Sequence, residues 1–146
     1  MQVKALGHVV LKVRDLNRSM PFYAQVLGLK EVARMGDRMV FFSIAGNHHD
    51  LALVQTGSEA PSAPEQSPGL AHVAFKVGDS LDELRAMQDW LETHGVELDR
   101  LADHRVSQSI YFHDPDGNQI EVFVDGDPRI WREDPTAVAT RLPLAL

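Results

Sequence analysis

The chain contains no cysteine. Disulfide bonds and thiolate metal ligands are therefore excluded, and any bound metal must be held by nitrogen and oxygen atoms. No stretch approaches the roughly 20 consecutive apolar residues that a membrane-spanning helix needs. Residues 1–7 also lack the apolar core of a secretory signal. We therefore expect a cytoplasmic protein with no membrane association.

A basic cluster is also missing, and the formal net charge at pH 7 is −7. Proteins that bind nucleic acid normally present a basic face to the phosphates, so we expect no nucleic-acid partner. The composition is that of an ordinary globular protein, with 44% hydrophobic and 24% charged residues. A length of 146 residues predicts one domain, residues 1–146, with a single core.

Two segments of eight residues, 8–15 and 72–79, resemble each other, and five of the eight positions are identical. Each opens with a histidine, and each is followed by the same predicted order of one helix and three strands. The repeat indicates two tandem βαβββ modules, each too small to bury its own apolar face. We place the first module at about residues 4–55 and the second at about residues 69–126. A proline-rich linker, residues 56–68, joins them, and a C-terminal tail, residues 127–146, follows.

The apolar patterns predict the elements within each module. In the first module we expect a helix over 15–27 and strands over 6–13, 29–35, 38–44 and 51–55. Pro21 would disturb that helix, so either Ser19 caps a helix that starts late or the first turn is irregular. In the second module we expect a helix that begins after Ser80 and ends at Gly95, and strands over 70–77, 96–101, 107–113 and 118–124.

Strand parity groups three residues that could bind a metal. Alternate residues of a strand face opposite sides, and His8 and His72 each lie opposite the aliphatic face of their strand. Glu121, in the last strand of the second module, likewise lies opposite an aliphatic face. A single strand histidine is more commonly structural, but two at equivalent repeat positions favour ligands. Two imidazoles and one carboxylate form a facial metal site with open positions.

These features resemble the vicinal oxygen chelate superfamily, which includes glyoxalases, bleomycin-resistance proteins and extradiol dioxygenases. The chain is most similar to the small one-domain catechol 2,3-dioxygenase-like members. The resemblance covers about residues 4–126. Its other motifs are Phe22-Tyr23, Val26-Leu27-Gly28-Leu29 and Asp114-Pro115-Asp116-Gly117-Asn118-Gln119-Ile120-Glu121. It implies an α+β fold in which two tandem βαβββ modules form a paired, cup-shaped mixed sheet with helices on the outer face.

The resemblance also narrows the ligand set. Ligands of this superfamily can come from the first and last strands of both modules, and here Ala52 takes the place that corresponds to Glu121. Three ligands, His8, His72 and Glu121, therefore remain, which resembles the Fe(II) site of extradiol dioxygenases and disfavours a four-ligand glyoxalase site. Fosfomycin-modifying enzymes share the triad but carry threonine just after the first histidine, where this chain has Val9. Mn, Ni or Zn are the alternative metals.

Further residues match catalytic positions of the same enzymes. By resemblance, His49 is the candidate for acid/base transfer and Tyr111 for a hydrogen bond to a substrate oxygen, and His104 would orient the substrate or close the site. Simpler explanations stand beside these roles. His48 and His49 could be polar turn residues, and His104 a solvated loop residue. Tyr111 could be a core aromatic residue whose hydroxyl reaches a carbonyl group.

The resemblance implies an extradiol ring-cleaving dioxygenase that acts on a small-molecule substrate, a catechol-type aromatic diol, with Fe(II) and O₂. One alternative is another metal-dependent enzyme of this fold, an isomerase, lyase or hydrolytic enzyme that uses Mn, Ni or Zn. Another is a small-molecule-binding resistance protein without catalysis. A homodimer is also consistent with such modules, because a partner often covers their exposed sheet edges.

Overall fold

The computed structural model describes residues 1–146, which form two compact units, Met1–Glu65 and Gln66–Leu146. The boundary falls within the predicted linker. Each unit contains one βαβββ module, so the predicted α+β class and the tandem order of elements are confirmed. The grouping of both units into one domain stays a prediction. Each helix is too short or too polar to cross a lipid bilayer.

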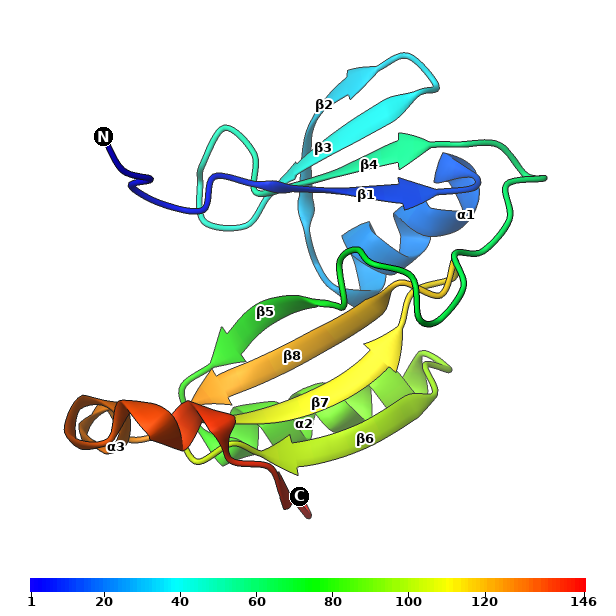
Figure 1. Ribbon diagram of the computed structural model, residues 1–146. Helices are drawn as coiled ribbons and strands as arrows, with labels where there is room; N and C mark the ends of the chain where they lie inside the picture. Colours follow the sequence, from blue (N-terminus) through cyan, green and yellow to red (C-terminus); the bar gives the residue numbers. More distant parts are fainter. The chain divides into compact units, whose positions relative to one another are not determined.

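The first unit holds a four-stranded sheet (Figure 1). Its strands, in spatial order, are β1 (Val9–Val13), β4 (Leu51–Gln55), β3 (Met39–Ser43) and β2 (Lys30–Met35). β1 runs parallel to β4, and the other pairs are antiparallel. The side chains of Leu11, Val40 and Leu53 share one face and are almost completely buried. The opposite face carries Val10 and Lys12, the residues of β1 that alternate with Leu11 and have the same parity as His8.

The predicted helix over 15–27 is split into two helical pieces. The α-helix α1 (Leu16–Pro21) is followed by a π-helical turn, η1 (Phe22–Val26). Capping by Ser19 is wrong, because the Asp15 carboxylate accepts a 2.8 Å hydrogen bond from the Asn17 amide and caps α1. Pro21 has no N–H to donate within the α-helix, and the backbone widens after it.

The second unit holds a five-stranded sheet. Its strands, in spatial order, are β5 (Val73–Gly78), β8 (Gln119–Asp125), β7 (Ser107–His113), β6 (Leu98–Asp103) and β9 (Leu142–Pro143). β5 runs parallel to β8, and the other pairs are antiparallel. The fifth strand is supplied by the C-terminal tail and was not expected from the repeat.

The helix α2 (Leu81–Thr93) covers one face of this sheet. Ser80 caps it as predicted, and its hydroxyl accepts from the Glu83 amide at 3.3 Å. Leu84 and Leu91 are fully buried, as are the residues of β7 and β8 that share the apolar face: Ile110, Phe112, Ile120 and Val122. The polar residues that alternate with them therefore lie on the face away from α2.

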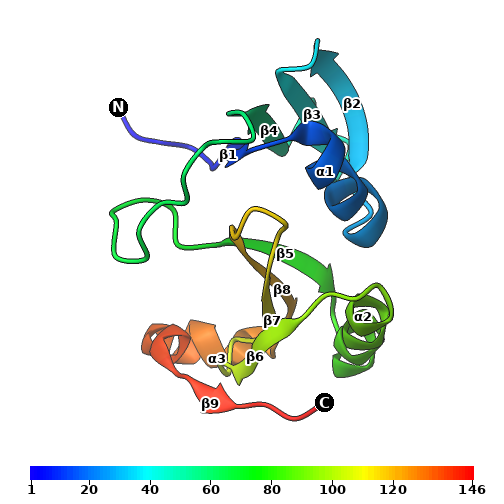
Figure 2. The ribbon, with the colours of Figure 1, turned by 90° about the vertical axis from the view of Figure 1, so that its right-hand side faces the viewer.

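The tail folds back onto the second unit as two short helices, α3 (Pro128–Glu133) and η2 (Pro135–Ala139), and then pairs β9 with β6. In Figure 2, α2 and the tail helices lie on opposite sides of the sheet. Pro128 and Pro135 each begin one of the two helices, so the tail does not form one long helix. Trp131 of α3 is 48% exposed, whereas Ala137 of η2 is buried.

Candidate functional site

The centre of the candidate site is the side chain of Glu121 in β8. Glu121 pairs with Ala74 of β5 on one side and with Tyr111 of β7 on the other. Directly paired residues of neighbouring strands present their side chains on the same face. Glu121 and Tyr111 therefore share the face away from α2, together with Ser109 two residues earlier in β7. Strand alternation thus selects the polar residues that surround Glu121.

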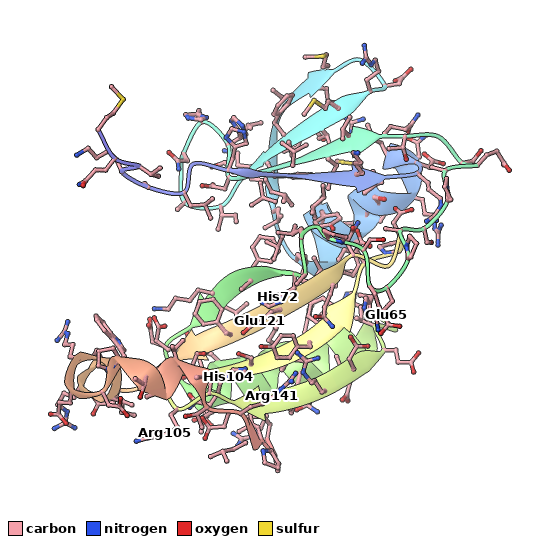
Figure 3. All side chains as sticks on the ribbon, in the orientation of Figure 1. Glu65, His72, His104, Arg105, Glu121 and Arg141 are labelled. Carbon is pink, nitrogen blue, oxygen red and sulfur yellow. The ribbon has the colours of Figure 1, made fainter.

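The carboxylate of Glu121 is buried and has a separate partner for each oxygen. Its Oε2 lies 3.0 Å from Nε2 of His72, and its Oε1 accepts a 2.6 Å hydrogen bond from the Ser109 hydroxyl. The Glu121 side chain is only 9% exposed, and the His72 side chain is 37% exposed. Figure 3 shows both residues together on the sheet of the second unit.

This pair fits a metal site. An imidazole nitrogen and a carboxylate oxygen that already face each other are donors that Fe, Mn, Ni and Zn accept. Buried carboxylates in proteins are normally paired or bound to a metal. Ser109 holds the second carboxylate oxygen, as groups around metal ligands commonly do. Neither unit alone gathers a third His, Asp or Glu side chain into such a cluster.

A hydrogen-bonded chain links His104 and Tyr111 to the tail. Nδ1 of His104 lies 2.7 Å from the backbone oxygen of Thr140, and its Nε2 lies 2.9 Å from the Tyr111 hydroxyl. A carbonyl oxygen only accepts, so Nδ1 carries the proton and Nε2 of the neutral ring is an acceptor. With a neutral imidazole, the Tyr111 hydroxyl therefore donates a hydrogen bond to Nε2 of His104.

Burial raises the pKa of the Tyr111 hydroxyl above its ordinary value, and the negative charge of Glu121 raises it further. The guanidinium carbon of Arg100 lies 3.8 Å from the centre of the Tyr111 ring, and this positive charge acts in the opposite direction. The net effect keeps Tyr111 protonated, and so able to donate, throughout the neutral pH range.

We expect a spectrophotometric titration of the folded protein to record this raised pKa. The chain has only two tyrosines, so the Tyr111→Phe variant leaves Tyr23 alone and the difference isolates Tyr111. The tyrosinate signal of Tyr111 should appear only above about pH 10, the ordinary value. Because the folded state holds this proton more tightly, the corresponding stability is full below about pH 10 and is lost as the pH rises through the folded-state pKa. An identical midpoint in denaturant would contradict the prediction.

The first unit holds two of the predicted site residues, His8 and His49. His8 directly precedes β1, whose first amide, at Val9, donates to the Asp50 oxygen at 3.1 Å. This pairing brings the preceding residues of the two strands together, and the ring centres of His8 and His49 lie 4.2 Å apart. Nδ1 of His48 lies 2.7 Å from Nδ1 of His49.

His49 is suited to be an uncharged base at neutral pH. Loss of hydration lowers its pKa below the ordinary value, and charges on His8 and His48 lower it further. Its ring also packs edge-on against Phe41, with ring centres 5.4 Å apart. A histidine that is neutral near pH 7 can accept a proton from a bound substrate.

The sheet register places Ala52 where the second unit has Glu121. Ala52 pairs with Val10 across the parallel strands β1 and β4, as Glu121 pairs with Ala74 across β5 and β8. Val10 and Ala74 are equivalent positions of the sequence repeat. Ala52 is fully buried and has no donor atom for a metal. At the equivalent positions, the first unit therefore has a histidine and no carboxylate.

The predicted site residues thus fall into two groups. The second unit brings together His72, Glu121, Tyr111 and His104. His72 contacts Glu121, Tyr111 contacts His104, and the ring centres of His72 and Tyr111 lie 5.8 Å apart. The first unit brings together His8 and His49. The convergence of His8 on the His72–Glu121 pair would join both units and stays a prediction. Sequence reasoning gave no role to Ser109 or Arg100. Parity with Tyr111 could have identified Ser109.

Comparisons with known proteins agree with this fold. The model of the Glyoxalase/Bleomycin resistance protein/Dioxygenase superfamily matches residues 5–122. A catechol-2,3-dioxygenase of Bacillus subtilis is 33% identical over 130 residues, which cover 88% of this chain and 44% of the relative. A biphenyl-2,3-diol 1,2-dioxygenase of Rhodococcus globerulus is 34% identical over 126 residues, covering 82% and 63%. The chain therefore spans about half of the length of these dioxygenases.

Other relatives are named for other functions, and they are closer to this chain in length than the dioxygenases are. The metallothiol transferase FosB of Lysinibacillus sphaericus is 32% identical over 123 residues, which cover 83% of this chain and 82% of the relative. Among solved structures, a glyoxylase/bleomycin resistance protein/dioxygenase domain from Frankia matches with a TM-score of 0.70 at 26% identity, covering 85% and 99% of the two chains. The fosfomycin resistance protein FosX of Listeria monocytogenes matches with a TM-score of 0.66 at 25% identity, covering 88% and 98%.

Proposed function

Because this chain belongs to the Glyoxalase/Bleomycin resistance protein/Dioxygenase superfamily, a superfamily of metal-dependent enzymes, we propose that it is an extradiol ring-cleaving dioxygenase. The substrate is a catechol-type aromatic diol, and O₂ is the second substrate. The observation that carries the proposal is the ligand count. His72 faces the buried Glu121, His8 is the equivalent histidine of the repeat, and Ala52 replaces the fourth ligand.

The proposed metal ligands are His8, His72 and Glu121, and Fe(II) is the proposed metal, with Mn, Ni or Zn as alternatives. Fe(II) bound by two imidazoles and one carboxylate supplies open positions and electrons for oxygen activation. Ser109 holds the Glu121 carboxylate in place through its 2.6 Å hydrogen bond. This hydrogen bond therefore limits the rotation of the Glu121 side chain.

The remaining residues would manage protons and orientation. His49 lies against the His8 ring and is held neutral, so it can accept the proton that a catechol hydroxyl loses on binding. Tyr111 has a raised pKa and keeps its proton, so it can donate a hydrogen bond to a substrate oxygen. In the free protein, Nε2 of a neutral His104 accepts a hydrogen bond from the Tyr111 hydroxyl and fixes the direction of that hydroxyl.

Thiol transfer is the second candidate. It is favoured by the FosB relative, of which this chain covers 82%, compared with 44% and 63% of the two dioxygenases. The two functions share a metal-dependent scaffold and differ in their substrates. They also differ in the use of O₂, which gives a direct experimental separation.

The decisive experiment is anaerobic purification with Fe(II), followed by metal analysis and exposure to catechols and air. We expect O₂ uptake and a coloured ring-opened product, both lost in His8→Ala. His94→Ala is the matched control, because His94 lies at the end of α2 and contacts Trp90 rather than the site. Stoichiometric zinc or nickel in the purified protein, with no O₂ uptake on any diol, would contradict the proposal. Consumption of a thiol with fosfomycin would instead support the second candidate.

A further inference from the structure

The side chain of Arg100 in β6 has no ionic or hydrogen-bonding partner. Its Nε is buried and has no acceptor for its hydrogen bond. No carboxylate forms an ion pair with its guanidinium. The guanidinium carbon lies 3.8 Å from the centre of the Tyr111 ring. A buried donor without an acceptor is uncommon in folded proteins and requires an explanation.

Other charged residues near Arg100 have partners of their own. Lys76, on the same face of the sheet, is held between Asp79 and Asp125. Asp99, the neighbour of Arg100 in the chain, pairs with His113 instead. Arg100 therefore stays without a counter-ion although carboxylates are close in sequence. This arrangement leaves its positive charge available to a ligand.

The register places Arg100 within reach of a molecule bound at Glu121. Arg100 pairs with Tyr111 across β6 and β7, and Tyr111 pairs with Glu121 across β7 and β8, so all three share one face. Neighbouring strands lie about 4.8 Å apart, so the backbones of Arg100 and Glu121 are about 10 Å apart. An aromatic ring with a short substituent has a length suited to this separation.

We propose that Arg100 binds a carboxylate carried by the substrate, so that the preferred substrate is an aromatic diol with a carboxylate on its ring or on a short side chain. The inference rests on the proposed function and names its substrate class. The planar guanidinium presents paired N–H donors that match the two oxygens of a carboxylate. The chain as a whole carries a net charge of −7 and so does not attract anions by itself. Recognition of an acid therefore requires a local cation such as Arg100.

The test compares two substrates that differ only in charge, 3,4-dihydroxyphenylacetate and its methyl ester. We expect the wild-type protein to favour the acid in kcat/KM, mainly through KM. Arg100→Gln should reduce this preference by about 10- to 100-fold, the range for a hydrogen bond to a charged group. Arg100→Lys should restore part of it, because it keeps the charge and loses the paired donors. Arg85→Gln, on α2, is the matched control and should leave the preference unchanged.

A structural role for Arg100, limited to packing on Tyr111, would lower the activity on both substrates equally. Equal losses, or a wild-type preference for the ester, would overturn the proposal. Its failure can be separated from failure of the dioxygenase assignment by calorimetry with 4-hydroxyphenylacetate, which has a single hydroxyl and is not a diol. Binding that depends on Arg100, in a protein that cleaves no diol, would support the carboxylate site and contradict the dioxygenase. Ring cleavage without any Arg100-dependent preference would support the dioxygenase and contradict the carboxylate site.

Discussion

Replacing Glu121 by glutamine is expected to reduce ring cleavage by more than 100-fold and to lower the iron content of the purified protein. The amide has nearly the same shape as the carboxylate, but it removes the anionic donor from the proposed triad. Loss of groups that merely support metal ligands costs about 10- to 100-fold in affinity or activity, so loss of a ligand should exceed that range. Metal analysis and O₂ uptake measure the two effects.

The isosteric change should leave the fold intact. The glutamine side-chain oxygen can still accept the hydrogen bond from Ser109, and the neutral side chain removes the cost of a buried charge. Circular dichroism and thermal melting of the metal-free protein would verify this. The control is Glu133→Gln in the exposed helix α3, which should keep full activity and iron. Wild-type iron content and turnover in Glu121→Gln would disprove the assignment of Glu121 as a ligand.

Ala52→Glu is expected to keep metal binding but abolish O₂-dependent ring cleavage. The register places residue 52 where the second unit has Glu121, so the new carboxylate would complete a fourth ligand position. A triad leaves room for both catechol oxygens and for O₂, and a fourth protein ligand takes one of these positions. We expect activity to fall by about 100-fold or more while the metal content stays equal or rises.

Bulk must be separated from ligation in this experiment, because Ala52 is fully buried. A larger residue in a packed position costs about 1–3 kcal/mol of stability. Ala52→Gln brings nearly the same bulk without the anionic donor and is the matched control. Denaturant unfolding would place both variants on one stability scale. If the two variants lost activity equally, the loss would reflect packing, and the vacant fourth position would have no role.

Much of the fold followed from local sequence patterns. The strands over 51–55 and 107–113 were predicted at their observed bounds. The first is an apolar segment, and the second ends at the turn signal that starts at Asp114. Strand alternation also placed Glu121 and Tyr111 on one face, since that argument needs only the period of a strand. The π-helical turn after Pro21 was missed because a hydrophobic pattern does not distinguish π from α geometry.

The finer arrangement of the site depends on contacts that alternation cannot supply. The role of Arg100 was missed because β6 carries a register shift between Leu98 and Arg100, which changes which residues face the site. The contact between His104 and Tyr111 depends on the turn at Arg105, a non-glycine residue with φ of 65°. Such a backbone conformation follows from the surrounding structure and leaves little trace in the sequence.

The contact between His104 and the carbonyl oxygen of Thr140 bears on how related proteins could differ. Thr140 lies beyond residues 5–122, the part of the chain that the superfamily model matches. The group that determines which nitrogen of His104 carries the proton is therefore supplied by an appended segment rather than by the shared scaffold. Two relatives with the same metal ligands and the same tyrosine, but different C-terminal extensions, would hold that histidine differently. Proton transfer could thus evolve through the extension while the ligand set stays fixed.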